Sequence, residues 1–487
     1  MKLYLKNHTE RYPVEQLQLQ LFAQEPSEFC TEPFTGDGTV SSLSRGKRYL
    51  TATAKVTYQG KTGFAVNRVL LDRADVRATR RILQRSYYLA ALQVLPAAPP
   101  WGALSGVRPT KLSTKCLMAG GSEKDAEKLL REVYFVSPER ARLCVDASRH
   151  TVEAAKLLDA DDLSVYIGIP FCPTTCLYCS FTSYPIASWA KRVDSYLDAL
   201  EREIEFAAVK FAGRHLNSIY IGGGTPTTLE PYQLDRLIRK IKCSFDLSDC
   251  LEFTVEAGRP DSITYEKLKV LRQHGISRIS INPQTMKQET LKLIGRHHTV
   301  EQMVESFHMA RELGFDNINM DLIMGLPEET LDDVRRTMEQ VAELAPDNLT
   351  VHSLALKRAA RLNMFKEDYK DYKIINTQEH MDLVADCAAQ MGLFPYYLYR
   401  QKGMAGNLEN VGYAKEGMAG VYNVLIMEEK QTIVACGAGA STKRVWTEPN
   451  PDGTHRIERA ENVKDVAQYI TRINEMIQRK QQLFSEE

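Results

Sequence analysis

The sequence predicts an α/β protein in which a partial (β/α)6 barrel is flanked by an N-terminal α+β domain and a C-terminal α+β cap. Two observations support this fold class. Between residues 161 and 356, short apolar segments alternate six times with longer amphipathic segments, whereas the sequence on either side is less regular. A chain of 487 residues also exceeds the size of one ordinary domain. We therefore expect three domains, over residues 1–160, 161–356 and 357–487.

The N-terminal region contains a β-hairpin pattern followed by helical patterns. Residues Tyr49–Leu71 alternate β-branched and polar side chains around a turn at Gln59 and Gly60. Helical periodicity follows over residues 76–95, 122–133 and 137–158. We find no motif in this region that indicates a particular chemistry.

The central region has the rhythm of repeated βα units. Strands are predicted over residues 163–171, 216–223, 251–258, 277–284, 318–326 and 348–356. Helices are predicted between them over residues 192–210, 232–242, 265–275, 300–314 and 331–345. Such repeats form a parallel sheet with right-handed crossovers, and six units rather than eight predict an open barrel. Its chemistry is expected at the carboxyl ends of the strands.

The C-terminal region mixes both element types. A helix is predicted around Thr377–Met391, and strand-like sequence follows over residues 394–401 and 431–441. A single terminal helix is predicted over Val463–Phe484. This mixture is the basis of the predicted α+β cap.

The charge balance gives no sign of a polyanionic partner. Lys+Arg and Asp+Glu both number 62, so no strong overall field favours nucleic acid or a membrane surface. The N-terminus has no apolar signal core, and no apolar stretch approaches the roughly 18 residues needed to span a bilayer. We expect a cytoplasmic protein. Ten cysteines are too few for a disulfide-rich secreted scaffold, and seven of them are scattered.

The other three cysteines form a cluster directly after the first predicted barrel strand. Cys172, Cys176 and Cys179 have the spacing C-x3-C-x2-C. Thiolates are soft ligands that suit iron–sulfur clusters and zinc. A structural zinc site uses four protein ligands, and no fourth Cys or His lies near these three in the sequence. A [4Fe–4S] cluster held by three thiolates keeps one iron open to a small molecule, so the motif favours such a cluster.

Polar or glycine residues mark the ends of the following strands. The segment Gly222–Thr227, GGGTPT, lets the backbone approach a ligand closely, and it lacks the Gly-Lys-Ser/Thr of a phosphate loop. Glu256 and Gln284 end the third and fourth strands. Asp321 lies within the apolar fifth strand, where an unpaired charge is costly to bury. We expect it to face the barrel mouth, where a carboxylate could bind a ribose diol.

Five segments together resemble the coproporphyrinogen dehydrogenase branch of the radical S-adenosylmethionine (SAM) superfamily, in particular the HemZ type of oxygen-independent coproporphyrinogen III oxidase. They are YIGIPFCPTTCLYCSFTSYPI, GGGTPT, INPQTM, DLIMGLPEET and MAGNLENVGYA. The resemblance implies a radical SAM barrel whose three cysteines hold a [4Fe–4S] cluster. It also implies that SAM binds the open iron and is reduced to methionine and a 5′-deoxyadenosyl radical.

The resemblance further implies site residues, because members of the wider oxidase family bind two SAM molecules. The contacts of the SAM on the cluster correspond to Tyr166, Gly223 and Glu256. The contacts of the second SAM correspond to Tyr178, Gly224, Thr225, Gln284, Arg296, Asp321 and Ala355.

The reaction that the resemblance implies is oxidative decarboxylation of two propionates of coproporphyrinogen III, which gives protoporphyrinogen IX. A flavodoxin- or ferredoxin-like protein would supply electrons, and the chain is expected to be a monomer. Because this substrate carries four carboxylates, basic residues should line its entry. The candidates are Lys357, Arg358, Arg400 and Lys402.

Two alternatives remain open at this point. A haem-carrying relative would use an HNxxYW-like motif, and the corresponding stretch, residues 406–413, has no His. A radical methyltransferase acting on a tetrapyrrole would share the same cofactor residues. Phe181 also stands where well-known oxidases often carry a further Cys, which bears on decarboxylation rather than on cluster assembly.

Overall fold

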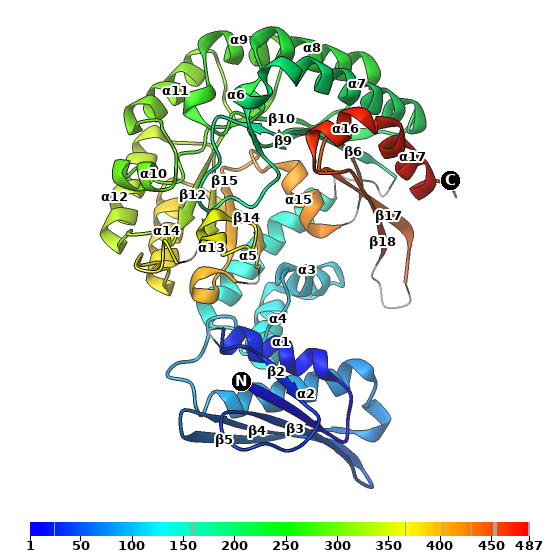
Figure 1. Ribbon diagram of the computed structural model, residues 1–487. Helices are drawn as coiled ribbons and strands as arrows, with labels where there is room; N and C mark the ends of the chain where they lie inside the picture. The colour runs from blue at the N-terminus through cyan, green and yellow to red at the C-terminus, as the bar shows by residue number, and fades with distance from the viewer. Residues whose placement is uncertain are drawn as a thin grey trace. The chain divides into compact units, whose positions relative to one another are not determined.

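The computed structural model describes residues 1–23, 25–156, 159, 161–365, 367–401, 403–429, 431–450 and 455–485 (Figure 1). The chain divides into two compact units. One comprises Met1–Val145 with Arg400–Gly403, and the other comprises Asp146–Tyr399 with Met404–Glu487. The domain boundaries that we predict at residues 160 and 356 stay predictions.

The first unit contains a five-stranded sheet in the order β2-β1-β3-β4-β5, with helix α2 packed on β4 and β5. Its strands are β1 (Lys2–Lys6), β2 (Glu28–Cys30), β3 (Gly38–Arg45), β4 (Tyr49–Tyr58) and β5 (Lys61–Leu70). Its helices are α1 (Arg11–Leu21), α2 (Val76–Ala91), α3 (Thr110–Met118), α4 (Glu123–Lys128) and the first part of α5 (Pro138–Ala155).

The predicted hairpin is confirmed as β4 and β5, which pair antiparallel from Tyr49–Leu70 to Tyr58–Lys61. Both turn residues have positive φ, 48° at Gln59 and 77° at Gly60. Positive φ at both positions is typical of the tight turn whose twist matches that of the flanking strands.

The second unit is built on an eleven-stranded sheet in the order β14-β15-β13-β12-β11-β10-β9-β6-β16-β17-β18. The six predicted barrel strands are confirmed, and they lie side by side and parallel in chain order. They are β6 (Leu163–Ile169), β9 (Leu216–Gly223), β10 (Glu252–Glu256), β11 (Arg278–Ser280), β12 (Ile318–Met324) and β13 (Asn348–Ser353). In the described residues the two outer strands of this set pair with β15 and β16 instead of with each other, so the barrel is open.

Helices cover the outer side of these strands (Figure 1). They are α7 (Val193–Lys210), α8 (Pro231–Ser244), α9 (Tyr265–Gln273), α10 (Gln288–Leu293), α11 (Val300–Glu312) and α12 (Leu331–Leu344). Thr299 and Thr330 begin α11 and α12 with capping boxes, which satisfy the first free amides of each helix. No helix among the described residues is long and apolar enough to cross a membrane.

Residues of the predicted C-terminal cap extend the same sheet at both edges. β14 (Phe394–Tyr399) and β15 (Asn410–Ala414) continue it beyond β13, and β16 (Thr432–Cys436) pairs parallel with β6. β17 (Ser441–Pro449) and β18 (His455–Glu461) follow β16. The shorter elements are β7 (Phe171–Cys172), β8 (Tyr184–Pro185), α6 (Ile186–Trp189), α13 (Arg361–Met364), α14 (Gln378–Gln390) and α15 (Val421–Glu428).

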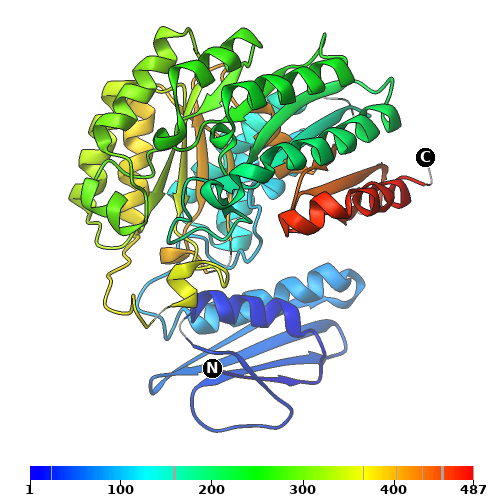
Figure 2. The same ribbon diagram turned by 45° about the horizontal axis from the view of Figure 1, so that its top comes forward.

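The prediction of one terminal helix is wrong, because the helix breaks at Arg472 into α16 (Val466–Thr471) and α17 (Ile473–Leu483). Both lie beside α7 (Figure 2). Tyr469 and Lys480 both bond the buried carboxylate of Glu203 on α7. On one straight helix these two residues would be about 16 Å apart along the axis, so only a break brings both to a single carboxylate.

Candidate active site

The clustered cysteines lie between β6 and β8, on residues 170–183, at the carboxyl end of the parallel strands. Cys172 ends the short strand β7, and we call this whole segment the cysteine loop. Cys172 and Cys176 are buried and Cys179 is half-buried. Thr225 Oγ1 donates to the Cys172 Sγ at 3.4 Å, and Arg259 Nη1 donates to the Cys176 Sγ at 3.6 Å. Two of the three sulfurs therefore have hydrogen-bond donors from the ends of the next two strands.

The surroundings of the thiols fit a positively charged soft metal group. Burial raises the pKa of the Cys172 thiol, and it raises that of Cys179 to about 11. Ionised thiolates here consequently require a compensating cation, which iron and the Arg259 guanidinium would supply. Three soft donors on one loop suit a [4Fe–4S] cluster.

The glycine segment at the end of β9 lies directly against the cysteine loop. The Gly224 amide donates to Ile169 O at 2.8 Å, and the Thr225 amide donates to Phe171 O at 2.7 Å. A Cβ atom at Gly224 would lie 2.5 Å from Phe171 O, a distance that no side chain tolerates. Gly223 has φ of 109°, which favours glycine. The glycines are therefore required for the close approach of these two strand ends.

Glu256, at the end of β10, accepts a 2.5 Å hydrogen bond from the hydroxyl of Tyr220 on β9. The Tyr220 ring stacks on Tyr422 of α15, with centroids 4.6 Å apart, and on Tyr166 of β6, with centroids 6.2 Å apart. Burial raises the pKa of Glu256 to about 7, and the charge of Asp321 adds to this despite the hydrogen bond from Tyr220. The carboxyl group is thus able to gain or lose a proton near neutral pH.

Gln284, beyond the end of β11, lies next to Asp321 in the middle of β12. The Gln284 amide donates to Asp321 O at 2.8 Å, although Gln284 has φ of 68°. Positive φ is uncommon outside glycine and clusters at functional positions. Asn319 Nδ2 donates to Asp321 Oδ1 at 2.7 Å and fixes this carboxylate. The predicted strand over residues 277–284 is shorter than expected, because regular pairing stops at Ser280 and only Gln284 bridges to β12.

Arg296 ties the ends of two strands together. Its Nη1 donates to Asn282 O, and its Nη2 donates to Gly258 O at 3.2 Å. Thr174 Oγ1 of the cysteine loop donates to Gly295 O at 2.9 Å, so the Arg296 backbone is also held against that loop. Arg296 is 4% exposed, and its Nε has no hydrogen-bond partner among the described residues.

The last two predicted contact residues differ in how they join this network. Tyr178 packs against an apolar cluster that includes Leu177, Leu291 and Ile294, and its buried hydroxyl lies beside the Cys176 thiol. Ala355 follows β13 and forms an isolated bridge with Met404. The other predicted residues are joined by short contacts from strand to strand.

The sequence reasoning missed two residues that contact the site. Arg259 bonds Cys176 and also donates to Thr174 Oγ1 at 2.9 Å and, through two nitrogens, to the carboxylate of Asp261. Its position three residues after the end of β10 is the sequence feature that could have indicated a role at the site. Tyr220 was concealed within an apolar strand, and nothing in the sequence pairs it with Glu256.

The basic residues predicted to meet the substrate lie in different places. Lys357 is half-buried and Arg358 is exposed, and both follow β13. Arg400 belongs to the first unit, where its Nη1 donates to Leu104 O at 2.6 Å and its guanidinium lies 5.4 Å from the Trp101 ring centroid. Lys402 lies outside the described residues.

The sequence profile of the Radical SAM superfamily matches residues 166–341. The chain is 39% identical over 469 residues to the oxygen-independent coproporphyrinogen-III oxidase-like protein HemZ of Bacillus subtilis (strain 168), covering 94% of this chain and 90% of HemZ. It is 42% identical over 198 residues to the heme chaperone HemW of the same organism, covering 40% of this chain and 51% of HemW. The chain thus spans about half the length of HemW.

A solved structure extends the comparison to the fold. Coproporphyrinogen III oxidase (HemN) from Escherichia coli, a radical SAM enzyme, superposes with a TM-score of 0.51 at 28% identity, over 67% of this chain and 72% of HemN. The cofactors of this chain are accordingly a [4Fe–4S] cluster and SAM. The HemZ similarity includes the flanking regions as well as the barrel. The chain therefore belongs to the radical SAM superfamily, within the family of oxygen-independent coproporphyrinogen-III oxidase-like proteins that includes HemZ.

Proposed function

We propose that this protein oxidatively decarboxylates two propionates of coproporphyrinogen III to vinyl groups, giving protoporphyrinogen IX. The observation that carries the proposal is the similarity to HemZ over 90% of that relative, in a chain whose strand ends place polar groups around a cysteine loop. Removal of one β-hydrogen from a propionate, followed by loss of CO2 and one electron, leaves a vinyl group. Two such events convert the substrate, and an electron acceptor must take the released electrons.

Cys172, Cys176 and Cys179 would hold the cluster in this proposal. When bound and reduced, the cluster supplies the electron that cleaves SAM to methionine and a 5′-deoxyadenosyl radical. The hydrogen bond from Thr225 to Cys172 and the charge of Arg259 beside Cys176 would stabilise the thiolates. A flavodoxin- or ferredoxin-like protein is our proposed electron donor.

Tyr166, Gly223 and Glu256 would contact the SAM on the cluster. The Tyr166 hydroxyl lies 3.2 Å from the position of a Cβ at Gly223, so the backbone of β9 and the Tyr166 side chain meet at one spot. The Glu256 carboxylate, fixed by Tyr220, provides an oxygen for an ammonium or a hydroxyl group. These three residues come from three adjacent strands, which is the geometry needed to surround one ligand.

The second SAM would contact residues farther along the same edge. They are Tyr178, Gly224, Thr225, Gln284, Arg296, Asp321 and Ala355. Asp321 presents a carboxylate suited to a ribose diol, and Gln284 is adjacent to it. Ala355 has the least support as a SAM contact, because its isolated β-bridge to Met404 does not connect it to the other predicted contact residues.

The proposal is tested anaerobically with reconstituted protein, SAM, a reductant and coproporphyrinogen III, with products followed by mass. The loss of two CO2 per substrate molecule is expected, together with formation of 5′-deoxyadenosine. Cys176→Ser is the matched control, because it removes one cluster ligand and should abolish both products. A gain of methyl groups, or 5′-deoxyadenosine without any change in the porphyrinogen, would contradict the proposed substrate reaction.

A haem chaperone is the second candidate, because the chain is 42% identical over 198 residues to the heme chaperone HemW. Against it, residues 406–413 contain no His, and Asn410, Val411, Gly412 and Tyr413 of this stretch are buried in β15. Titration of haem into the purified protein decides between the two. Tight stoichiometric binding, without decarboxylation in the assay above, would favour the chaperone.

A further inference from the structure

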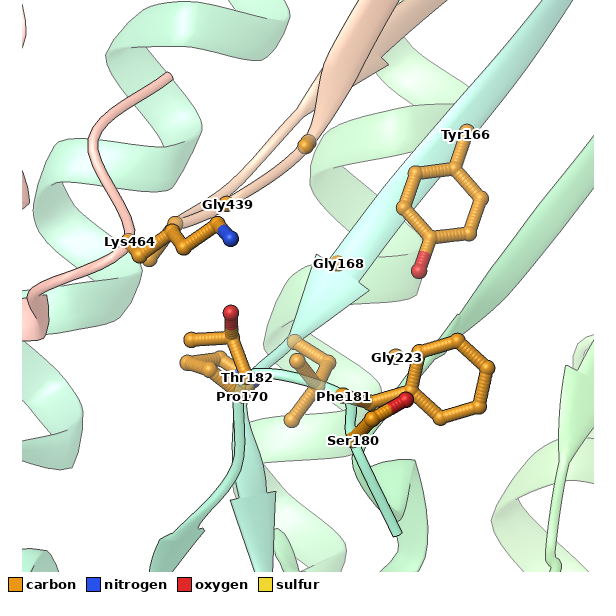
Figure 3. A pocket seen from close by; sticks show the side chains of 12 residues that line it. Tyr166, Gly168, Pro170, Ser180, Phe181, Thr182, Gly223, Gly439 and Lys464 are labelled. Carbon is orange, nitrogen blue, oxygen red and sulfur yellow. The ribbon is translucent and has the colours of Figure 1, made fainter. Parts of the chain in front are cut away.

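A cavity of about 220 Å3 opens at the carboxyl ends of β6 and β9 (Figure 3). Tyr166 and Gly223 form one wall, and residues 180–182 of the cysteine loop form a second. Residues 438–440, on the loop that follows β16, form a third wall, and Lys464 closes the edge beside them. The cavity is therefore shared between the proposed SAM site and a segment that the sequence does not connect with chemistry.

Lys464 is the only charged residue that lines this cavity in the described part of the chain. Its side chain is exposed, and no hydrogen-bond or ion-pair partner of its Nζ occurs among the described residues. Figure 3 shows its ammonium nitrogen on the cavity side of Gly439, near Thr182. The positive charge is consequently free to meet a ligand.

The backbone amides of the loop after β16 cannot serve an anion, because each already has an acceptor. The Gly437 amide donates to Glu203 Oε2 at 2.7 Å, and the Ala438 amide donates to Tyr196 Oη at 3.1 Å. The Gly439 amide donates to Val463 O at 2.8 Å, and the Ala440 amide donates to Gly437 O at 3.2 Å. On this wall, Lys464 is therefore the donor that remains for a negatively charged group.

The backbone that carries Lys464 is held in place by the buried carboxylate of Glu203. Asn462 Nδ2 donates to Glu203 Oε1 at 2.8 Å and to Gly437 O at 2.7 Å, and Lys480 also bonds this carboxylate. Tyr184 Oη donates to Lys464 O at 3.4 Å. Because its base is fixed, the lysine loses only side-chain freedom on meeting a ligand, which lowers the entropic cost of binding.

We propose that Lys464 is the cation of a carboxylate-binding subsite in this cavity. The inference rests on the proposed function, which supplies two sources of a carboxylate: a propionate of the tetrapyrrole, and the methionine part of SAM. Phe181, 76% exposed, lines the same cavity and offers an apolar surface next to the charge. A tetrapyrrole presents apolar rings next to carboxylates, which this combination suits.

The test uses the cluster-reconstituted full chain under anaerobic conditions. Binding of coproporphyrin III, its tetramethyl ester and SAM is measured separately by equilibrium titration. Lys464→Met should weaken binding of coproporphyrin III roughly tenfold, because one charge-assisted contact is lost, and should leave the tetramethyl ester unchanged. Lys464→Arg should retain the binding. Lys269→Met removes an equal charge from the exposed face of α9 and should change none of the three affinities.

The outcomes distinguish a tetrapyrrole propionate from the SAM carboxylate as the ligand of Lys464. They also distinguish failure of the proposed subsite from failure of the proposed function. Weakened SAM binding with unchanged coproporphyrin binding would identify the methionine carboxylate as the occupant. Equal weakening for the acid and the ester, or no change in any affinity, would overturn the subsite. If the unaltered protein binds no coproporphyrin while Lys464→Met still weakens SAM, the subsite stands and the proposed function is overturned.

Discussion

The hydroxyl of Tyr220 donates a 2.5 Å hydrogen bond to Oε1 of Glu256, and this contact joins the ends of β9 and β10 beneath the proposed SAM site. It fixes the orientation of the carboxylate and favours its ionised form, whereas burial opposes ionisation. The net pKa of Glu256, about 7, makes its charge sensitive to pH in the range where the protein would work.

SAM affinity should depend on this charge. If the ionised carboxylate of Glu256 binds SAM, the affinity should fall by about tenfold per pH unit below about 7, where the group is protonated. Equilibrium dialysis of SAM against the reconstituted protein between pH 5.5 and 8.5 measures this. Glu256→Gln should bind weakly with no such slope, and Tyr220→Phe should move the transition to higher pH. A slope that persists in Glu256→Gln would assign it to another group.

Glu256 should also lower the stability of the cofactor-free protein as pH rises. Its pKa is raised from 4.5 to about 7, so the folded state binds more protons than the unfolded state between these values. The free energy of unfolding therefore decreases as pH rises through this window and stays lower above pH 7. Glu256→Gln should remove this loss. Relative to the unaltered protein, the free energy of unfolding of this variant should be higher by up to about 3 kcal/mol at pH 8 and nearly unchanged at pH 4. Urea unfolding at the two pH values checks the difference.

Arg259 should set the potential of the cluster. Its Nη1 lies 3.6 Å from the Cys176 Sγ, and a cation or hydrogen bond at a ligating sulfur favours the reduced state. Arg259→Gln should lower the reduction potential by an amount on the order of tens of millivolts while iron content is retained. Redox titration followed by electron paramagnetic resonance measures the shift. Arg239→Gln, on the exposed face of α8, is the matched control, and an equal shift there would argue against a local effect.

The buried ion pair of Glu203 and Lys480 should be needed for stability. Both side chains are almost fully buried, and Tyr469, Asn462 and the Gly437 amide also donate to the carboxylate. Lys480→Met leaves this charge without its cation and should cost about 3–5 kcal/mol of unfolding free energy. The double variant Lys480→Met/Glu203→Gln should recover most of the loss, because the carboxylate charge is gone. Urea unfolding of the three proteins tests this, and equal losses in the single and double variants would refute it.

The strand pattern could be read from the sequence because apolar runs and amphipathic helices alternate with a fixed period. All six barrel strands occur where they are predicted, and the hairpin at Gln59 and Gly60 follows from local turn chemistry. The single terminal helix was the error. Periodicity continues through Arg472, and only the shared carboxylate of Glu203, far away in the chain, requires the break.

The cysteine spacing and the order of the strand ends are local properties, so the sequence by itself determined the cluster motif and the edge of the sheet where the site lies. Contacts between distant segments were decided by the tertiary structure alone. Arg259 reaches Cys176, Tyr220 orients Glu256, and the segment between β18 and α16 brings Lys464 to the cavity. The periodicity of the sequence does not predict these long-range contacts. They depend on how parallel strands from separate repeats align and on which side chains share a face of the sheet.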